Sequence, residues 1–201
     1  MTVVFKYDKQ ALGDLPWKLP DGIEIGDLRF YISSLTMGKN GEVVWRERNS
    51  YHLLDAKDPS TLSISMSGPG EEDVDFLEFY LGVDSAKSES GVMDGDLDPL
   101  RGMFWTWQSG YIHFRMEGTC SACPPPRREF QLHLGGYRHP FSSVKRITLP
   151  IKGGQELKLH ADLKFLMNQV SFPSDAHIMS PGTRACALAE AASGMFTVSF
   201  E

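Results

Sequence analysis

The sequence has few cysteines, no long apolar run and no excess of positive charge. Its three cysteines include only one C-x-x-C pair, whereas a structural zinc site requires a second such pair. No apolar run approaches the ~20 residues that a membrane-spanning helix needs. Lys and Arg number 20 against 26 Asp and Glu, a net charge of -6, so the chain lacks the basic surface that nucleic acids or anionic lipids require.

Catalytic and nucleotide-binding motifs are also absent from the sequence. It contains no G-x-S-x-G, H-E-x-x-H, P-loop or G-x-G-x-x-G pattern. Six histidines and many acidic residues always allow a catalytic triad to be imagined, but no spacing singles one out. We therefore predict that the protein is not an enzyme.

The composition is that of an ordinary globular domain. With 41% hydrophobic and 23% charged residues, 201 residues can bury a sizeable core. Short alternating segments recur between clusters of Gly, Pro, Asn and Asp, without a β-α-β rhythm or an internal repeat. The pattern predicts one all-β domain over residues 1–201, an antiparallel β-sandwich of seven or more strands.

One helix near the C-terminus is expected to interrupt the strands. Ser180 is the predicted N-cap, Pro181 the first helical residue and Gly194 the stop signal. A last strand is expected after Gly194, and residues 161–168 can turn from a strand into a short helix. The packing face of the main helix is expected to consist of Ala185, Leu188, Ala189 and Ala192.

Two neighbouring strands are predicted to present histidines on their polar sides. In residues 111–117 the aliphatic residues share one parity and His113 has the other, and residues 129–135 place His133 in the same way. A hairpin centred on the intervening loop sets His113 opposite His133, with Cβ atoms ~5 Å apart. The pair can hold a metal ion, or it can be two strand histidines without a role, because a one-residue slip breaks the pairing.

Three aspartates, Asp94, Asp96 and Asp98, stand at alternate positions, as at the start of a calcium loop. An EF-hand is excluded, because its glycine position holds Pro99 and its final glutamate position holds Trp105. Calcium remains possible. Aspartates that cap their own turn explain the run equally well, and we expect the loop to be structural first, ordering the approach to Trp105.

Other residues leave alternatives open. Trp105 and Trp107 share a parity, which suits core packing as well as function. Cys120 and Cys123 can form a disulfide in an exposed loop or remain thiols. Met179, close to His177, can offer a thioether to copper or simply be buried at the start of the helix.

Several motifs together resemble the MbnP-like family. They are "RFYISSLTM", "GDLDPLRGMFWTWQSGYIHFRMEG", "FQLHLGG" and "IMSPG", and the resemblance covers roughly residues 3–200. The family comprises extracytoplasmic β-rich proteins related to a periplasmic protein of methanobactin gene clusters and to copper-repressible surface proteins of methanotrophs. This chain is similar to the short form of Bacteroidetes-type bacteria.

The resemblance implies a periplasmic or secreted β-sandwich, with any signal peptide already removed. It also implies a di-haem cytochrome c peroxidase-like partner that oxidises a tryptophan to kynurenine, which then binds copper together with two histidines. Trp105 and Trp107 match the aromatic motif. A Trp-x-His pair found in a methanotroph relative is missing, because Ser109 stands two positions after Trp107.

Two functions therefore follow from the sequence. One is an extracytoplasmic copper-binding protein with His113, His133 and His177 as metal ligands. The other is a metal-free module that binds a protein or glycan through its Trp-rich loop. Clustered histidines favour copper, whereas dispersed histidines beside an exposed aromatic patch favour the module.

Overall fold

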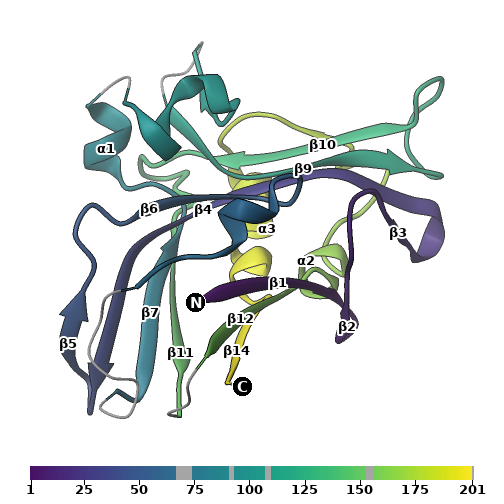
Figure 1. The fold of residues 1–201 in the computed structure, drawn as a ribbon. Helices are drawn as coiled ribbons and strands as arrows, with labels where there is room; N and C mark the ends of the chain where they lie inside the picture. The colour runs from purple at the N-terminus through teal and green to yellow at the C-terminus, as the bar shows by residue number, and fades with distance from the viewer. Residues whose placement is uncertain (67–73, 91–92, 107–109, 153–155, 201) are drawn as a thin grey trace.

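A computed structural model describes residues 1–66, 74–90, 93–106, 110–152 and 156–200. The chain folds into a β-sandwich of two sheets. The large sheet has the strand order β11-β7-β4-β9-β10-β13, with β3, β5 and β6 joined to β4 and β8 to β9. The small sheet, β14-β12-β1-β2, packs against one side of the large sheet, and α1 lies on the opposite side (Figure 1).

The strands are short apart from β4 and β9. Their bounds are β1 Thr2–Tyr7, β2 Gln10–Ala11, β3 Trp17–Leu19, β4 Ile23–Lys39, β5 Glu42–Arg46, β6 Tyr51–Asp55, β7 Phe76–Leu81, β8 Phe104–Trp105, β9 Gly110–Cys120, β10 Glu129–Gly135, β11 Lys145–Pro150, β12 Leu157–Asp162, β13 His177–Ile178 and β14 Phe196–Phe200. The helices are α1 Ser85–Glu89, α2 Lys164–Met167 and α3 Thr183–Ser193.

The predicted sandwich is confirmed, but its strands are not all antiparallel. β1 pairs with β12 in parallel, and so does β10 with β13. Parallel neighbours require long crossover connections, and both pairs join segments far apart in the sequence. Local alternation therefore predicted the strands without revealing these two pairings.

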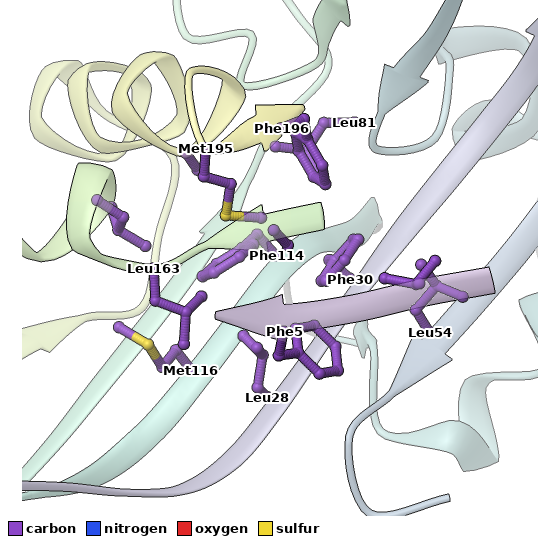
Figure 2. Packing of buried hydrophobic residues seen from close by; sticks show 14 of the residues in the cluster. Phe5, Leu28, Phe30, Leu54, Leu81, Phe114, Met116, Leu163, Met195 and Phe196 are labelled. Carbon is purple, nitrogen blue, oxygen red and sulfur yellow. The ribbon is translucent and has the colours of Figure 1, made fainter. Parts of the chain in front are cut away.

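The core lies between the two sheets and is rich in aromatic rings. Phe30 of β4 stands at its centre, with ring centroids 6.1 Å from Phe5 of β1, 5.9 Å from Phe114 of β9 and 5.7 Å from Phe196 of β14. Figure 2 shows these four rings among the surrounding aliphatic side chains. Both sheets thus contribute to one core, which holds the outer face of β4 and β9 in place.

The C-terminal helix packs with the predicted face. Its buried residues are Ala185, Leu188, Ala189 and Ala192, and it ends at Gly194. The predicted start was wrong, because the helix begins at Thr183 with Gly182 at the N-cap. Pro181 instead packs against Gly136, where an added Cβ would lie 2.8 Å from the proline, so the chain stays non-helical as far as Gly182. The short helix expected within residues 161–168 is α2, and α1 was not predicted.

Cys120 and Cys123 form a disulfide at the end of β9. Both residues are buried, so the expected bond is present but is not exposed. Cys120 N–H also donates to the Arg128 carbonyl at 2.9 Å, which closes the β9–β10 hairpin. In the described part of the chain, no helix is long and apolar enough to cross a bilayer.

The close approach of β4 to β9 generates a prediction about Gly118. A Cβ at this position would lie 1.9 Å from the Glu24 carbonyl oxygen, whereas a Cβ at Gly13 would meet nothing within 4 Å. We expect Gly118→Ala to lower the free energy of unfolding by roughly 1–3 kcal/mol, the usual cost of overpacking, and Gly13→Ala to leave it nearly unchanged. Chemical denaturation of both variants checks this, and equal stabilities would contradict the pairing of β4 with β9.

Candidate functional site

The β9–β10 hairpin does not place His113 opposite His133 as the sequence predicted. His133 pairs with Arg115, and Leu134 pairs with Phe114. The prediction placed the centre of the hairpin one residue too early, because β9 continues to Cys120 before the chain turns. This correction separates the two imidazoles and changes which residues can share a ligand.

His113 is buried, with only 1% of its surface exposed. The predicted alternation does not hold here, because the pairing of β9 with β10 shifts between Phe114 and Ile112, and Ile112 packs with Tyr111 in a second cluster instead of with Phe114 in the main core. The imidazole Nδ1 lies 3.0 Å from Ser143 Oγ, and the Gly82 backbone packs against the ring. Within the described residues, Nε2 has no hydrogen-bond partner. Burial lowers the pKa of His113 to about 3, so the imidazole is neutral.

His133 is held by a carboxylate on the neighbouring strand. Its Nε2 lies 2.7 Å from Glu117 Oε1, and the other oxygen of Glu117 accepts from the Arg115 guanidinium at 2.9 Å. The hydrogen bond from His133, followed by that from Arg115, lowers the pKa of Glu117 to about 2. Among the described residues, Nδ1 of His133 has no hydrogen-bond partner.

The parallel pairing of β10 with β13 brings His177 to the same face as His133. Gln131 is level with His177, and Leu132 with Ile178. Because Leu132 and Ile178 pack toward the main core, Gln131 and His177 point outward, as does His133 two residues after Gln131. Met179 directly follows β13, which ends at Ile178.

Exposure supports this placement. His177 is exposed and Met179 is 41% exposed, so the alternative of a buried methionine at the start of the helix is wrong. The structure thus brings two of the three predicted histidines together on one sheet face and leaves His113 elsewhere. Across the ranges that the structure describes, no three His, Cys, Asp or Glu side chains gather in a group able to hold a metal ion.

The aspartate loop is folded by hydrogen bonds to its own backbone and to the sheet. Asp98 Oδ1 accepts from Leu100 N–H at 2.8 Å, and Asp96 Oδ2 accepts from Leu53 N–H at 3.2 Å. Asp94 precedes the first turn, without a side-chain cap bond. These contacts are of the structural kind expected for the loop, and the carboxylates do not converge on one point.

Two buried tyrosines of the sheet also hold this loop. The hydroxyl of Tyr31 donates to the Asp96 carbonyl at 2.9 Å, and that of Tyr111 donates to the Leu97 carbonyl at 2.8 Å. Burial raises the pKa of both phenols, so they remain neutral donors. The loop is therefore attached to β4 and β9 by side chains that sequence reasoning did not single out.

Arginines from the same two strands hold the end of the loop. Arg29 donates to the Arg101 carbonyl at 2.8 Å, and Arg115 donates to the Gly102 carbonyl at 3.0 Å. Both guanidinium groups also contact the buried carboxylate of Asp27. Arg29 shares its parity with Tyr31, and Arg115 with Tyr111. This pattern of polar or amphipathic side chains on adjacent strands could have identified the two arginines from the sequence.

Trp105 follows this loop and packs inward. It is 5% exposed, and an added Cβ on Gly135 would lie 2.6 Å from its ring. A pocket of about 210 Å³ lies beside it, lined also by Tyr137, Phe141 and Pro181. Trp107 lies outside the described residues. The core-packing interpretation therefore fits Trp105, although its ring also forms part of a pocket wall.

These features define a β-sandwich protein with a histidine- and methionine-bearing sheet face and a separate aromatic pocket. A family model for MbnP matches residues 2–180, and the chain belongs to the MbnP family. Its fold is similar to that of MbnP from Methylosinus trichosporium, with a TM-score of 0.59 and 14% sequence identity. The similarity covers 98% of this chain and 96% of that chain. No curated protein matches significantly.

The buried, neutral His113 predicts a pH dependence of stability. Its pKa of about 3 in the folded protein is below its ordinary value of 6.5, so the unfolded chain binds this proton first as pH falls. The stabilisation that comes from keeping His113 neutral is fully present above pH 6.5 and is lost as the pH falls toward 3. The lowered pKa of Glu117 causes a further loss of stability below pH 4.5, its ordinary pKa. We expect wild type to lose about 1 kcal/mol between about pH 7 and 5.5 that His113→Gln does not lose, measured by urea denaturation. Equal losses would contradict a buried neutral His113.

The hydrogen bonds of the aspartate loop predict little response to calcium. Millimolar calcium is expected to shift the melting temperature of wild type and of Asp96→Ala by no more than ~2 °C, because the carboxylates do not form a ligand set. Asp96→Ala itself is expected to be destabilised through the lost bond to Leu53. A calcium-dependent rise of many degrees in wild type that disappears in the variant would show that the loop binds the ion.

Proposed function

We propose that this is a non-catalytic extracytoplasmic copper-binding protein that uses the outer face of β10 and β13. The observation that carries the proposal is the parallel register of these strands, which sets His133 and His177 on one face, with the exposed Met179 one residue beyond β13. His113, the third predicted ligand, is not part of this face. The proposed ligand set is therefore two imidazoles and one thioether.

The chemistry of these ligands favours copper over hard cations. Calcium and magnesium require several oxygen ligands, and the described residues contain no converging carboxylates. Imidazole binds borderline metals, and thioether sulfur prefers soft ones such as Cu(I). His177 and Met179 are solvent-exposed, whereas His133 is 6% exposed, so a copper ion from solvent meets His177 and Met179 first.

Glu117 gives His133 the arrangement of a metal-ligating histidine. Such histidines commonly donate one ring N–H to a carboxylate, which orients the ring and leaves the other nitrogen as the ligand. Here the 2.7 Å contact from Nε2 to Glu117 assigns the proton to Nε2, and the lone pair stays on Nδ1, which is buried and has no hydrogen-bond partner among the described residues. Glu117 itself is held by Arg115 and stays ionised.

The disulfide supports a location outside the cytoplasm. Disulfides persist in oxidising compartments such as the periplasm, whereas cytosolic thiols are kept reduced. The Cys120–Cys123 bond closes the turn of the same hairpin that carries His133. We therefore propose a periplasmic or secreted protein.

The proposed partner is a di-haem cytochrome c peroxidase-like protein that oxidises Trp105 or Trp107 to kynurenine. The support is the family membership and the aromatic motif. An unmodified indole N–H is a donor only and cannot ligate copper. Protein made without this partner is therefore expected to bind copper through histidines and methionine alone.

A second candidate function is a metal-free interaction module that binds a protein or glycan. The pocket of about 210 Å³ beside Trp105 favours it, because Tyr137, Phe141 and Pro181 add apolar surface at an accessible edge. Phe141 is 41% exposed, which is unusual for so large an apolar side chain. This candidate does not require the histidines to cooperate.

Copper titration of histidine variants tests the first proposal. We expect wild type to retain copper at micromolar concentration near pH 7 and to release it below about pH 6, where free histidine is protonated. His133→Ala and His177→Ala are expected to weaken binding at least about tenfold, and Glu117→Gln by about tenfold through the lost orientation of His133. His52→Ala is the matched control, because His52 also contacts a glutamate, at 2.7 Å, but on β6.

The same titration is run on protein made with and without a co-expressed di-haem peroxidase, with intact mass to detect conversion of tryptophan to kynurenine. If neither preparation retains copper and His133→Ala has no effect, the copper function is wrong. The interaction module then becomes the preferred function.

A further inference from the structure

A larger pocket lies on the outer face of the large sheet, at β4 and β7. Its volume is about 510 Å³, within the roughly 300–1,000 Å³ typical of small-molecule sites. Its lining comes from these two strands, from β5, from the Asp84–Ser85 segment that starts α1 and from the segment before β11. None of the proposed copper ligands lines it, so an inference from this pocket goes beyond the proposed function.

The floor of the pocket is formed where β4 departs from regular pairing. The register of β4 with β7 shifts between Ser33 and Thr36, and Ser34 has a φ of 55°, in the left-handed region that side chains other than glycine rarely adopt. Irregularities of this kind re-aim side chains and occur often beside binding sites. Here the shift brings Ser33, Ser34 and Thr36 to the pocket together.

The hydroxyl groups on the floor are held by hydrogen bonds to the backbone. Ser33 Oγ donates to the Gly82 carbonyl at 2.7 Å, and Thr36 Oγ1 donates to the Ser34 carbonyl at 3.0 Å. Both residues are buried, so these bonds fix the shape of the floor. The carboxylates of Glu78 and Asp84 provide the hydrogen-bond acceptors of the lining.

The charges at the pocket nearly cancel. Arg146 neutralises Glu78 at 2.6 Å. Asp84 accepts from the Tyr51 hydroxyl and caps α1 through Lys87 N–H, and the remaining charged lining residue is Arg46. An anionic ligand would meet two carboxylates, and a cationic ligand would meet Arg46. The lining therefore suits a neutral ligand rich in hydroxyl donors.

Tyr137 adds an aromatic wall that joins this pocket to the smaller one beside Trp105, since it lines both. An added Cβ on Gly110 would lie 3.1 Å from the ring, and the Arg138 guanidinium lies 5.1 Å from its centroid, while part of Tyr137 remains exposed. An amphipathic aromatic of this kind combines apolar area with a polar hydroxyl. We propose that the pocket binds a neutral saccharide, with Glu78 and Asp84 accepting from its hydroxyls and Tyr137 packing against its C–H surface.

Calorimetric titration with defined sugars tests this proposal. The neutral probes are cellotriose, maltotriose and N,N′-diacetylchitobiose. The charged probes are trigalacturonic acid, which is anionic, and the glucosamine trimer chitotriose, which is cationic. We expect at least one neutral probe to bind with a millimolar or tighter Kd, at least about tenfold tighter than either charged probe. EDTA is present throughout, so the result does not depend on copper.

Variants locate the binding in the pocket. Tyr137→Ala and Glu78→Gln are each expected to weaken binding of the neutral probe at least about fivefold, because each removes a direct contact. Phe165→Ala is the control, since this residue is 54% exposed on α2 and does not line the pocket. Circular dichroism verifies that every variant is folded, and Glu78→Gln, which keeps the side-chain shape and alters the contacts with Arg146 and Thr148, provides the test if Tyr137→Ala unfolds.

The proposal is overturned if no neutral probe binds at a concentration of about 20 mM, which is well above the millimolar Kd expected here. It is also overturned if a charged probe binds as tightly, or if both pocket variants bind like Phe165→Ala.

Discussion

The buried carboxylate of Asp27 is the group on which the outer face of the large sheet depends. It is 4% exposed and lies 3.1 Å from Arg29, 2.9 Å from Lys57 and 3.3 Å from Arg115. A buried charge is tolerated only when it is paired, and here one anion orients two arginines at once. Each arginine then donates to a carbonyl of the Arg101–Gly102 turn, so the loop before Trp105 is anchored through Asp27.

The same network reaches the proposed copper face. Arg115 bonds Glu117 as well as the loop, and Glu117 orients His133. The aspartate loop and His133 are therefore supported by one set of charged side chains on β4 and β9. Because these contacts are partly buried, solvent screens them less than ordinary surface ion pairs. The charged side chains can lie beside a region covered by apolar residues and tyrosines because each of them is paired with a group of opposite charge.

Strand register decides which chemical groups meet on this face. A two-residue difference in the pairing of β9 with β10 gives His133 an arginine as its opposite neighbour and leaves His113 beside Ser143. The pairing of β10 with β13 instead brings two histidines to one face, because it joins residues more than forty positions apart in sequence. Similar alternation of side chains can thus yield an isolated histidine in one place and a potential ligand set in another.

Much of the fold could be predicted from local patterns. Alternation indicated the strands and the outward direction of His133, and the spacing of Ala185, Leu188, Ala189 and Ala192 indicated the buried face of α3. The alternate aspartates indicated a turn, and the motifs around Trp105 indicated the family. These features are local, since they depend on backbone geometry and on residues close together in the chain.

The sequence alone thus determined the strands, the main helix and the family. Tertiary structure decided the rest, because it depends on contacts between distant segments. His113 is buried against Gly82, which follows β7, and Ser143, which precedes β11, and the shared face of His133 and His177 requires a parallel strand that follows β12 and α2. The roles of Asp27, Arg29 and Arg115 arise only when β4, β9 and the aspartate loop are assembled. No alternation within one strand encodes such contacts, since each depends on the register between separate strands.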